Sequence, residues 1–226
     1  MRTGSDEKFL KAVVLALALT GMFLALGRGP AHGQIPAFAG KFPAPQAKGE
    51  QTAVFAGGCF WGVDAVFKHV KGVTRAVSGF SGGSARSAHY EIVSTGTTGH
   101  AESVEITFDP SQVSYEDLLR VFFSVAHDPT QLNRQGPDEG TQYRSAIFYA
   151  DEAQKQLALA YIAQLNKAGV FGAPIVTEVA PLKGFYPAEA YHQDFLAHHP
   201  NYPYIVFNDL PKLKALQKQF PALYKP

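Results

Sequence analysis

The chain has 226 residues with a formal net charge of +1, and 46% of its residues are hydrophobic. This length and apolar content allow a packed core and exclude a disordered chain, while the balanced charge excludes the broad basic surface typical of nucleic-acid binding. A single cysteine, Cys59, excludes an intrachain disulfide framework and the cysteine-rich zinc sites.

The first predicted element is an export signal. Three basic residues precede 15 uncharged residues, from Ala12 to Leu26, which suit the apolar region of a signal peptide and fall short of the about 18 residues of a membrane span. Small residues at positions 31 and 33 predict cleavage after Gly33, with an uncleaved N-terminal anchor as the alternative. We therefore expect a signal peptide at 1–33, a proline-containing linker at 34–50 and a single domain at 51–226, exported to the periplasm as a monomer without stable membrane insertion.

The rest of the chain alternates between strand and helix patterns. In chain order these predict a strand at 52–56, a helix at 59–70, strands at 73–80 and 104–108, a helix after the Ser114–Asp117 capping box, a strand at 146–150, a helix from the Asp151 cap to Gly169, a strand at 176–180, and helices at 188–199 and 210–220. The alternation lacks the regular rhythm of a doubly wound sheet. We predict an α/β (α+β) fold, a two-layer sandwich with a mixed sheet.

Cys59 follows two glycines at a predicted strand-to-helix junction. The unpaired N–H groups and positive dipole end of a helix start favour a thiolate, which is the reactive form of cysteine. Phe60 and Trp61 come next and suggest an apolar pocket for a small group. The structural alternative is an inert buried cysteine among core aromatics.

Three other segments carry more polar side chains than a simple connection needs. The first, 89–102, places Tyr90 and Glu102 around a glycine-rich loop; the second, 138–145, runs from Asp138 past Tyr143 into a strand; the third, 190–195, contains His192. Each also has a purely structural interpretation, as a solvated turn, a loop with a surface ion pair, and an amphipathic helix.

Other functional classes fit these residues less well. The histidines lack metal-ligand spacing and the glycine clusters match no nucleotide-binding fingerprint, so we expect no metal and no bound cofactor. The number of residues between Cys59 and His192 is similar to that between the catalytic cysteine and histidine of papain-like proteases, but the papain signature around the cysteine is missing. A cysteine protease, a one-cysteine peroxidase and a non-catalytic binding module stay as alternatives.

Three motifs together resemble the A-type peptide methionine sulfoxide reductases. They are Gly58-Cys59-Phe60-Trp61-Gly62, Gly99-His100-Ala101-Glu102 and Gly140-Thr141-Gln142-Tyr143-Arg144-Ser145, and the likeness in order and spacing runs from about Thr52 to about Phe207. The resemblance implies a ferredoxin-like core and the reduction of the S epimer of methionine sulfoxide, in oxidised proteins or as the free amino acid, which repairs oxidative damage.

The resemblance also implies a role for each matching residue. Cys59 attacks the sulfoxide sulfur and becomes a sulfenic acid, and Glu102 is the acid, whose pKa an apolar setting would raise. The other matches are Tyr90 and Tyr143, which hold the sulfoxide oxygen, Phe60 and Trp61, which enclose the S-methyl group, and Asp138, which positions the substrate.

The chain departs from the family at several positions. Asp64, Pro137 and the pair Ala88-His89 replace the usual residues. The resolving cysteines that many relatives carry near the C-terminus are missing, because Cys59 is the one cysteine of the chain. We therefore expect an external thiol, from a thioredoxin-like or glutaredoxin-like protein or a small thiol, to reduce the sulfenic acid.

Overall fold

The computed structural model describes residues 35–40 and 49–226. The predicted signal peptide at 1–33 and the predicted linker residues 34 and 41–48 lie outside the described residues. The described residues 35–40 are packed against the domain: Ile35 is buried, and the Tyr161 hydroxyl donates to the Pro36 carbonyl at 2.7 Å. No helix in the described ranges is long and apolar enough to cross a membrane.

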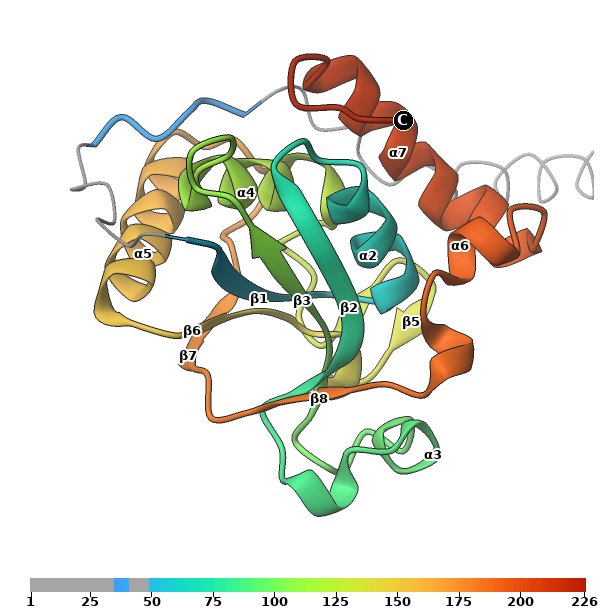
Figure 1. The fold of residues 1–226 in the computed structure, drawn as a ribbon. Helices are drawn as coiled ribbons and strands as arrows, with labels where there is room; N and C mark the ends of the chain where they lie inside the picture. The colour runs from blue at the N-terminus through green and yellow to red at the C-terminus, as the bar shows by residue number, and fades with distance from the viewer. Residues whose placement is uncertain (1–34, 41–48) are drawn as a thin grey trace, which may run out of the picture. The chain divides into compact units, whose positions relative to one another are not determined.

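The sheet is mixed, as predicted. In the described residues six strands lie in the order β7-β6-β1-β3-β2-β8, where β6 and β7 pair in parallel and all other neighbours are antiparallel (Figure 1). Their bounds are β1 Gln51–Gly57, β2 Val73–Ser81, β3 Ala101–Phe108, β6 Ser145–Tyr149, β7 Glu178–Pro181 and β8 Phe185–Pro187. A separate pair is formed by β4 Arg134–Gln135 and β5 Asp138–Glu139. The predicted strands are confirmed; the sequence pattern missed β8, which has three residues, and the two-residue strands β4 and β5.

The helices are α2 Phe60–Lys68, α3 Tyr90–Val93, α4 Tyr115–Val121, α5 Glu152–Lys167, α6 Phe195–His198 and α7 Leu210–Gln219. The predicted capping box is confirmed, since the Ser114 hydroxyl accepts from the Asp117 N–H while the Asp117 carboxylate accepts from the Ser114 N–H. Helix α4 continues as a π-helical turn over Phe122–Ala126. Asp151 caps α5 by accepting from the Gln154 N–H at 2.8 Å.

The two faces of β1 bury different cores, which follows from the two-residue period of a strand. Ala53 and Phe55 join the large core with apolar residues of α2, α4 and α5, whereas Val54 and Ala56 join a small cluster that includes Phe148. The large core surrounds Phe55, which stacks on Phe122 at a centroid distance of 4.9 Å. Cys59 belongs to this larger core.

The helix predicted over 188–199 is wrong as a single element. The chain instead forms a 3-10 turn at Ala190–His192 and the short helix α6, separated by an extended Gln193 and a left-handed Asp194 with φ 55°. The break lets the Gln193 amide accept from the Ser78 N–H at 3.0 Å and donate to the Ser78 carbonyl at 2.9 Å. These tertiary hydrogen bonds to β2 outweigh the local helical pattern.

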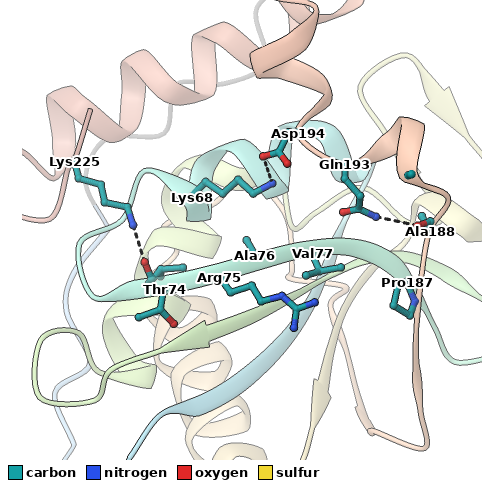
Figure 2. A pocket seen from close by; sticks show the side chains of 12 residues that line it. Lys68, Thr74, Arg75, Ala76, Val77, Pro187, Ala188, Gln193, Asp194 and Lys225 are labelled. Atoms are coloured by element: carbon teal, nitrogen blue, oxygen red, sulfur yellow. Dashed lines mark hydrogen bonds and ion pairs between the residues drawn. The ribbon is translucent and has the colours of Figure 1, made fainter.

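The backbone at the outer edge of β2 has partners near its two ends and pairs with no described strand between them. Strand β8 pairs only with Gly79–Ser81, and Lys225 donates to the Val73 carbonyl at the other end, at 2.6 Å. A hollow of about 590 Å³ lies along this edge. Figure 2 shows Lys68 reaching Asp194 and Gln193 reaching Ala188 across it. Charged and amide side chains thus protect the unpaired edge from pairing with another chain.

Candidate functional site

Cys59 lies where β1 turns into α2, in the N-cap position of the helix. Gly58 makes the turn with a φ of +87°, and a Cβ there would lie 2.5 Å from the Gln135 side chain, so both conformation and space require glycine. The backbone N–H of Trp61 lowers the pKa of Cys59, but the Cys59 side chain forms no capping hydrogen bond to the helix. Cys59 is 8% exposed, so the surrounding protein encloses most of the residue.

The surroundings of Cys59 do not favour the thiolate form that its position at a helix start predicts. Burial, followed by the carboxyl groups of Glu102 and Asp209, raises the pKa of the Cys59 thiol well above its ordinary value. The Trp61 N–H and the Lys212 ammonium lower it and do not compensate. The helix start acts in the predicted direction, but desolvation of the sulfur is the larger effect.

Glu102 projects from β3 to the first turn of α2. Its Oε2 accepts from the Phe60 N–H at 3.0 Å, which places the carboxyl group beside the residue that follows Cys59. Burial raises the pKa of Glu102 to about 8, the Phe60 N–H opposes this, and the Asp138 charge adds to it. The carboxyl group is therefore protonated at neutral pH and is able to donate its proton.

Tyr90 and Tyr143 lie in the same electrostatic environment. Burial is the main cause that raises the pKa of each hydroxyl, and the charges of Glu102 and Cys59 raise both further. The charges of Asp138 and Tyr90 also raise the pKa of Tyr143. Both hydroxyls therefore stay protonated and are hydrogen-bond donors around the Cys59–Glu102 pair.

Aromatic side chains line the site next to the sulfur. Phe60 is buried against Phe80, while Trp61 is only partly buried and stacks on Phe195 with a centroid distance of 3.7 Å and an interplanar angle of 6°. Tyr202 and Tyr204 meet the Trp61 ring edge-on. The segment from 190 to 204 thus builds one wall of the site, although sequence patterns suggested this only for His192.

His192 fixes the orientation of Trp61. Its Nδ1 accepts from the Trp61 Nε1–H at 3.2 Å, so the proton of the neutral ring is on Nε2. Burial lowers the pKa of His192, which keeps the ring neutral. The ring also packs on Tyr90 at 4.2 Å and on Phe60 at 5.1 Å. His192 is therefore a structural partner of three predicted site residues.

Asp138 has a partner that no sequence pattern indicated. Its Oδ2 accepts from the Tyr204 hydroxyl, 66 residues away in the sequence. Burial raises the pKa of Asp138, and the Tyr204 hydroxyl and the Lys212 ammonium lower it. Burial, followed by the charge of Cys59, raises the pKa of Tyr204, so this tyrosine belongs to the same electrostatic environment as Cys59. No local pattern marks Tyr204, because only the fold brings it to the site.

Several motif residues hold the site loops rather than line the site. His100 is buried, with its Nδ1 accepting from the Gly83 N–H and its Nε2 donating to the Ser84 carbonyl. Arg144 donates to the Gly99 carbonyl and pairs with Glu178 at 2.9 Å. These contacts tie the glycine-rich loop before Glu102 to the loop that carries Tyr143.

Comparisons with known proteins agree on one family. The family model described as peptide methionine sulfoxide reductase matches residues 51–223. The chain is 65% identical over 178 residues to peptide methionine sulfoxide reductase MsrA 2 of Mesorhizobium japonicum, covering 79% of this chain and 91% of that protein. It is 50% identical over 177 residues to an MsrA of Thermus thermophilus, covering 78% of this chain and 99% of that protein.

Solved structures agree with the sequence comparison. Methionine sulfoxide reductase A of Corynebacterium diphtheriae is 36% identical, with a TM-score of 0.60 and coverage of 80% of this chain and 91% of that one. The reduced form of Mxr1 from Saccharomyces cerevisiae is 32% identical, with a TM-score of 0.61 and coverage of 68% and 87%.

Proposed function

Because this chain belongs to the peptide methionine sulfoxide reductase family, and is an oxidoreductase that reduces methionine sulfoxide to methionine, we propose that Cys59 is its nucleophile and Glu102 its acid. The observation that carries this proposal is the hydrogen bond from the Phe60 N–H to Glu102 Oε2, which sets a protonated carboxyl group beside the sulfur-bearing residue. The proposed substrate is the S epimer, bound in protein or as the free amino acid.

In the first step Cys59 Sγ forms a bond to the sulfoxide sulfur while the sulfoxide oxygen takes the Glu102 proton. The resulting hydroxyl group transfers to Sγ and the bond between the two sulfurs breaks, which releases methionine and leaves a Cys59 sulfenic acid. The Cys59 thiol proton restores Glu102. The substrate sulfur gains two electrons and Cys59 loses two, so the step needs no other oxidant or reductant.

The remaining site residues bind and orient the sulfoxide. Tyr90 and Tyr143 donate hydrogen bonds to the oxygen, where negative charge develops as the S–O bond lengthens. Phe60 and Trp61 enclose the methyl group. Asp138, held by Tyr204, positions the rest of the substrate.

Recycling uses two external thiols. The first attacks the sulfenic sulfur, water leaves, and a mixed disulfide to Cys59 forms; the second releases Cys59 and leaves with the first as a disulfide. Because Cys59 is the one cysteine of the chain, the second sulfur comes from another molecule. We propose a thioredoxin-like or glutaredoxin-like protein or a small thiol as this reductant.

The assay that tests the function uses the separate S and R sulfoxides of a methionine peptide with an external dithiol. We expect turnover of the S epimer only, and none with Cys59→Ser. Turnover of the R epimer, or activity of Cys59→Ser, would contradict the proposal. Peptide cleavage or peroxide consumption in place of sulfoxide reduction would favour a cysteine protease or a one-cysteine peroxidase.

We also propose export to the periplasm, on the basis of the apolar run from Ala12 to Leu26. N-terminal sequencing of the exported protein is expected to begin at Gln34. An intact Met1 end would contradict cleavage and favour an N-terminal anchor.

A further inference from the structure

A buried ion pair at the start of α7 has no part in the reaction described above. Lys212 Nζ lies 3.1 Å from Asp209 Oδ1, and the Asp209 side chain is completely buried. Asp209 Oδ2 has no hydrogen-bond partner among the described residues. A buried carboxylate with one unpartnered oxygen is costly to fold, so stability alone does not account for this pair.

The ion pair lies against the helix that begins after Cys59. A Cβ at Gly62 would lie 2.1 Å from Asp209 Oδ1 and 2.6 Å from Lys212 Nζ. Gly62 has no positive φ, and glycine inside a helix costs about 1 kcal/mol relative to alanine, so it serves close approach and not conformation. Gly62 is the third residue of the helix and Cys59 is its N-cap, so both belong to the first turn of α2. The missing side chain therefore lets the pair approach the helix on the Cys59 side.

The Lys212 charge acts on Cys59 and lowers the pKa of its thiol. The titratable groups that interact electrostatically with Cys59 come from several elements: Glu102 from β3, Asp209 and Tyr204 from the π-helical turn Ile205–Asp209 and its N-cap, Lys212 from α7, Tyr90 from α3 and Tyr143 from the turn before β6. The Lys212 charge also acts on Asp138. The ammonium group thus acts on both Cys59 and Asp138, while Asp209 holds it against the first turn of α2.

We propose that Lys212, positioned by Asp209, stabilises the Cys59 thiolate when a thiol reductant expels it from the mixed disulfide. In that step the second thiolate bonds to the reductant sulfur, the bond to Cys59 Sγ breaks, and its electron pair leaves on Sγ, which then takes up a proton. This inference rests on the proposed use of an external thiol. Burial disfavours a leaving thiolate, and the positive charge of Lys212 reduces this cost.

Alkylation of Cys59 by iodoacetamide across a pH range tests the electrostatic part without substrate or reductant. Lys212→Met is expected to raise the apparent pKa of Cys59 by about one unit, and thus to slow alkylation about tenfold below that pKa. Asp209→Asn keeps an oxygen that accepts from Lys212 and removes the negative charge that raises the pKa of Cys59, so it is expected to shift this pKa in the opposite direction. Misfolding would not shift the pKa of Cys59 in opposite directions in the two variants. Shifts in the same direction, or no shift in folded variants, would therefore overturn the proposal.

Two further variants complete this test. Lys214→Met removes an exposed lysine from the same helix and is expected to leave the profile unchanged. Lys212→Arg keeps the charge and is expected to restore the profile. If Lys214→Met shifted the pKa of Cys59 as much as Lys212→Met does, the effect would come from the net charge of the protein, which would contradict the proposal.

Release of Cys59 from a preformed mixed disulfide with glutathione tests the chemical step. With dithiothreitol as the attacking thiol, a shift of about one pKa unit in the leaving thiol predicts that Lys212→Met returns free Cys59 several-fold more slowly than the wild type, and Lys214→Met at the wild-type rate. Equal rates for all three proteins would contradict the role in recycling. Because no sulfoxide is present, failure of the proposed sulfoxide chemistry would leave this result interpretable.

Discussion

Burial of the Glu102 carboxyl group affects both its protonation and the stability of the folded chain. The same desolvation that raises its pKa to about 8 keeps a proton available at neutral pH and makes the ionised form unfavourable in the folded chain. Its hydrogen bond from the Phe60 N–H holds Oε2 in place. Position and protonation are therefore set by different contacts and can be separated by substitution.

Glu102→Gln removes the transferable proton and retains an oxygen that accepts from the Phe60 N–H. We expect the rate of methionine formation in a single turnover to fall about 10² to 10⁴-fold, because a positioned acid contributes an effect of that size, with little change in KM. Glu139→Gln, at an exposed position on β5, is the control and should leave the rate unchanged. Similar losses in both variants, or none in Glu102→Gln, would refute the assigned role.

The pH dependence of stability is a second prediction for Glu102. Because its pKa is about 8 in the folded chain against an ordinary 4.5, the folded state binds the proton more tightly, and stability falls as pH rises through this interval. This pKa shift corresponds to a decrease of at most about 5 kcal/mol in the free energy of unfolding. Glu102→Gln has no carboxyl group at this position, so we expect no such decrease in that variant. Urea unfolding of both proteins from pH 5 to 9 measures the difference; parallel profiles would contradict it.

At the scale of elements, the segment from 188 to 204 matters more than its sequence pattern suggested. The predicted single helix is broken so that Gln193 reaches β2 and Phe195 stacks on Trp61. Lys68 connects helix α2 to this segment, since it donates to Asp64 of its own helix at 2.8 Å and to Asp194 at 2.6 Å. The substitution Asp64 is therefore accommodated by a lysine one helical turn later.

Gln193→Ala tests how far this segment depends on the sheet edge. It removes the bonds to both backbone groups of Ser78 and the bond to the Ala188 carbonyl. We expect the free energy of unfolding to fall by about 1–3 kcal/mol, because the buried Ser78 N–H loses its partner, whereas the Ser78 carbonyl still accepts from the Ala188 N–H. Gln217→Ala, exposed on α7, is the matched control in urea unfolding. An equal effect of both substitutions would show that the edge contact is unimportant.

At the scale of the whole molecule, the parts of the site that lie in local motifs could be predicted and the rest could not. The alternation of β3 and the caps at Ser114 and Asp151 predicted the scaffold around Glu102 because periodicity and capping are local effects. Tyr204 and the Asp209–Lys212 pair reach Cys59 only through the packing of the C-terminal segment on α2. The raised pKa of Cys59 likewise depends on burial, which its helix-start position did not reveal.

Single-turnover oxidation of Cys59 tests the central claim most directly. Reduced protein is mixed with the S sulfoxide of a methionine peptide without any reductant, and methionine formation and a sulfenic-acid trap on Cys59 are followed by mass spectrometry. We predict one methionine per chain, with an equal amount of trapped sulfenic acid at Cys59, and neither product with Cys59→Ser. Methionine formed while Cys59 stays unmodified, or formed by Cys59→Ser, would contradict this chemistry.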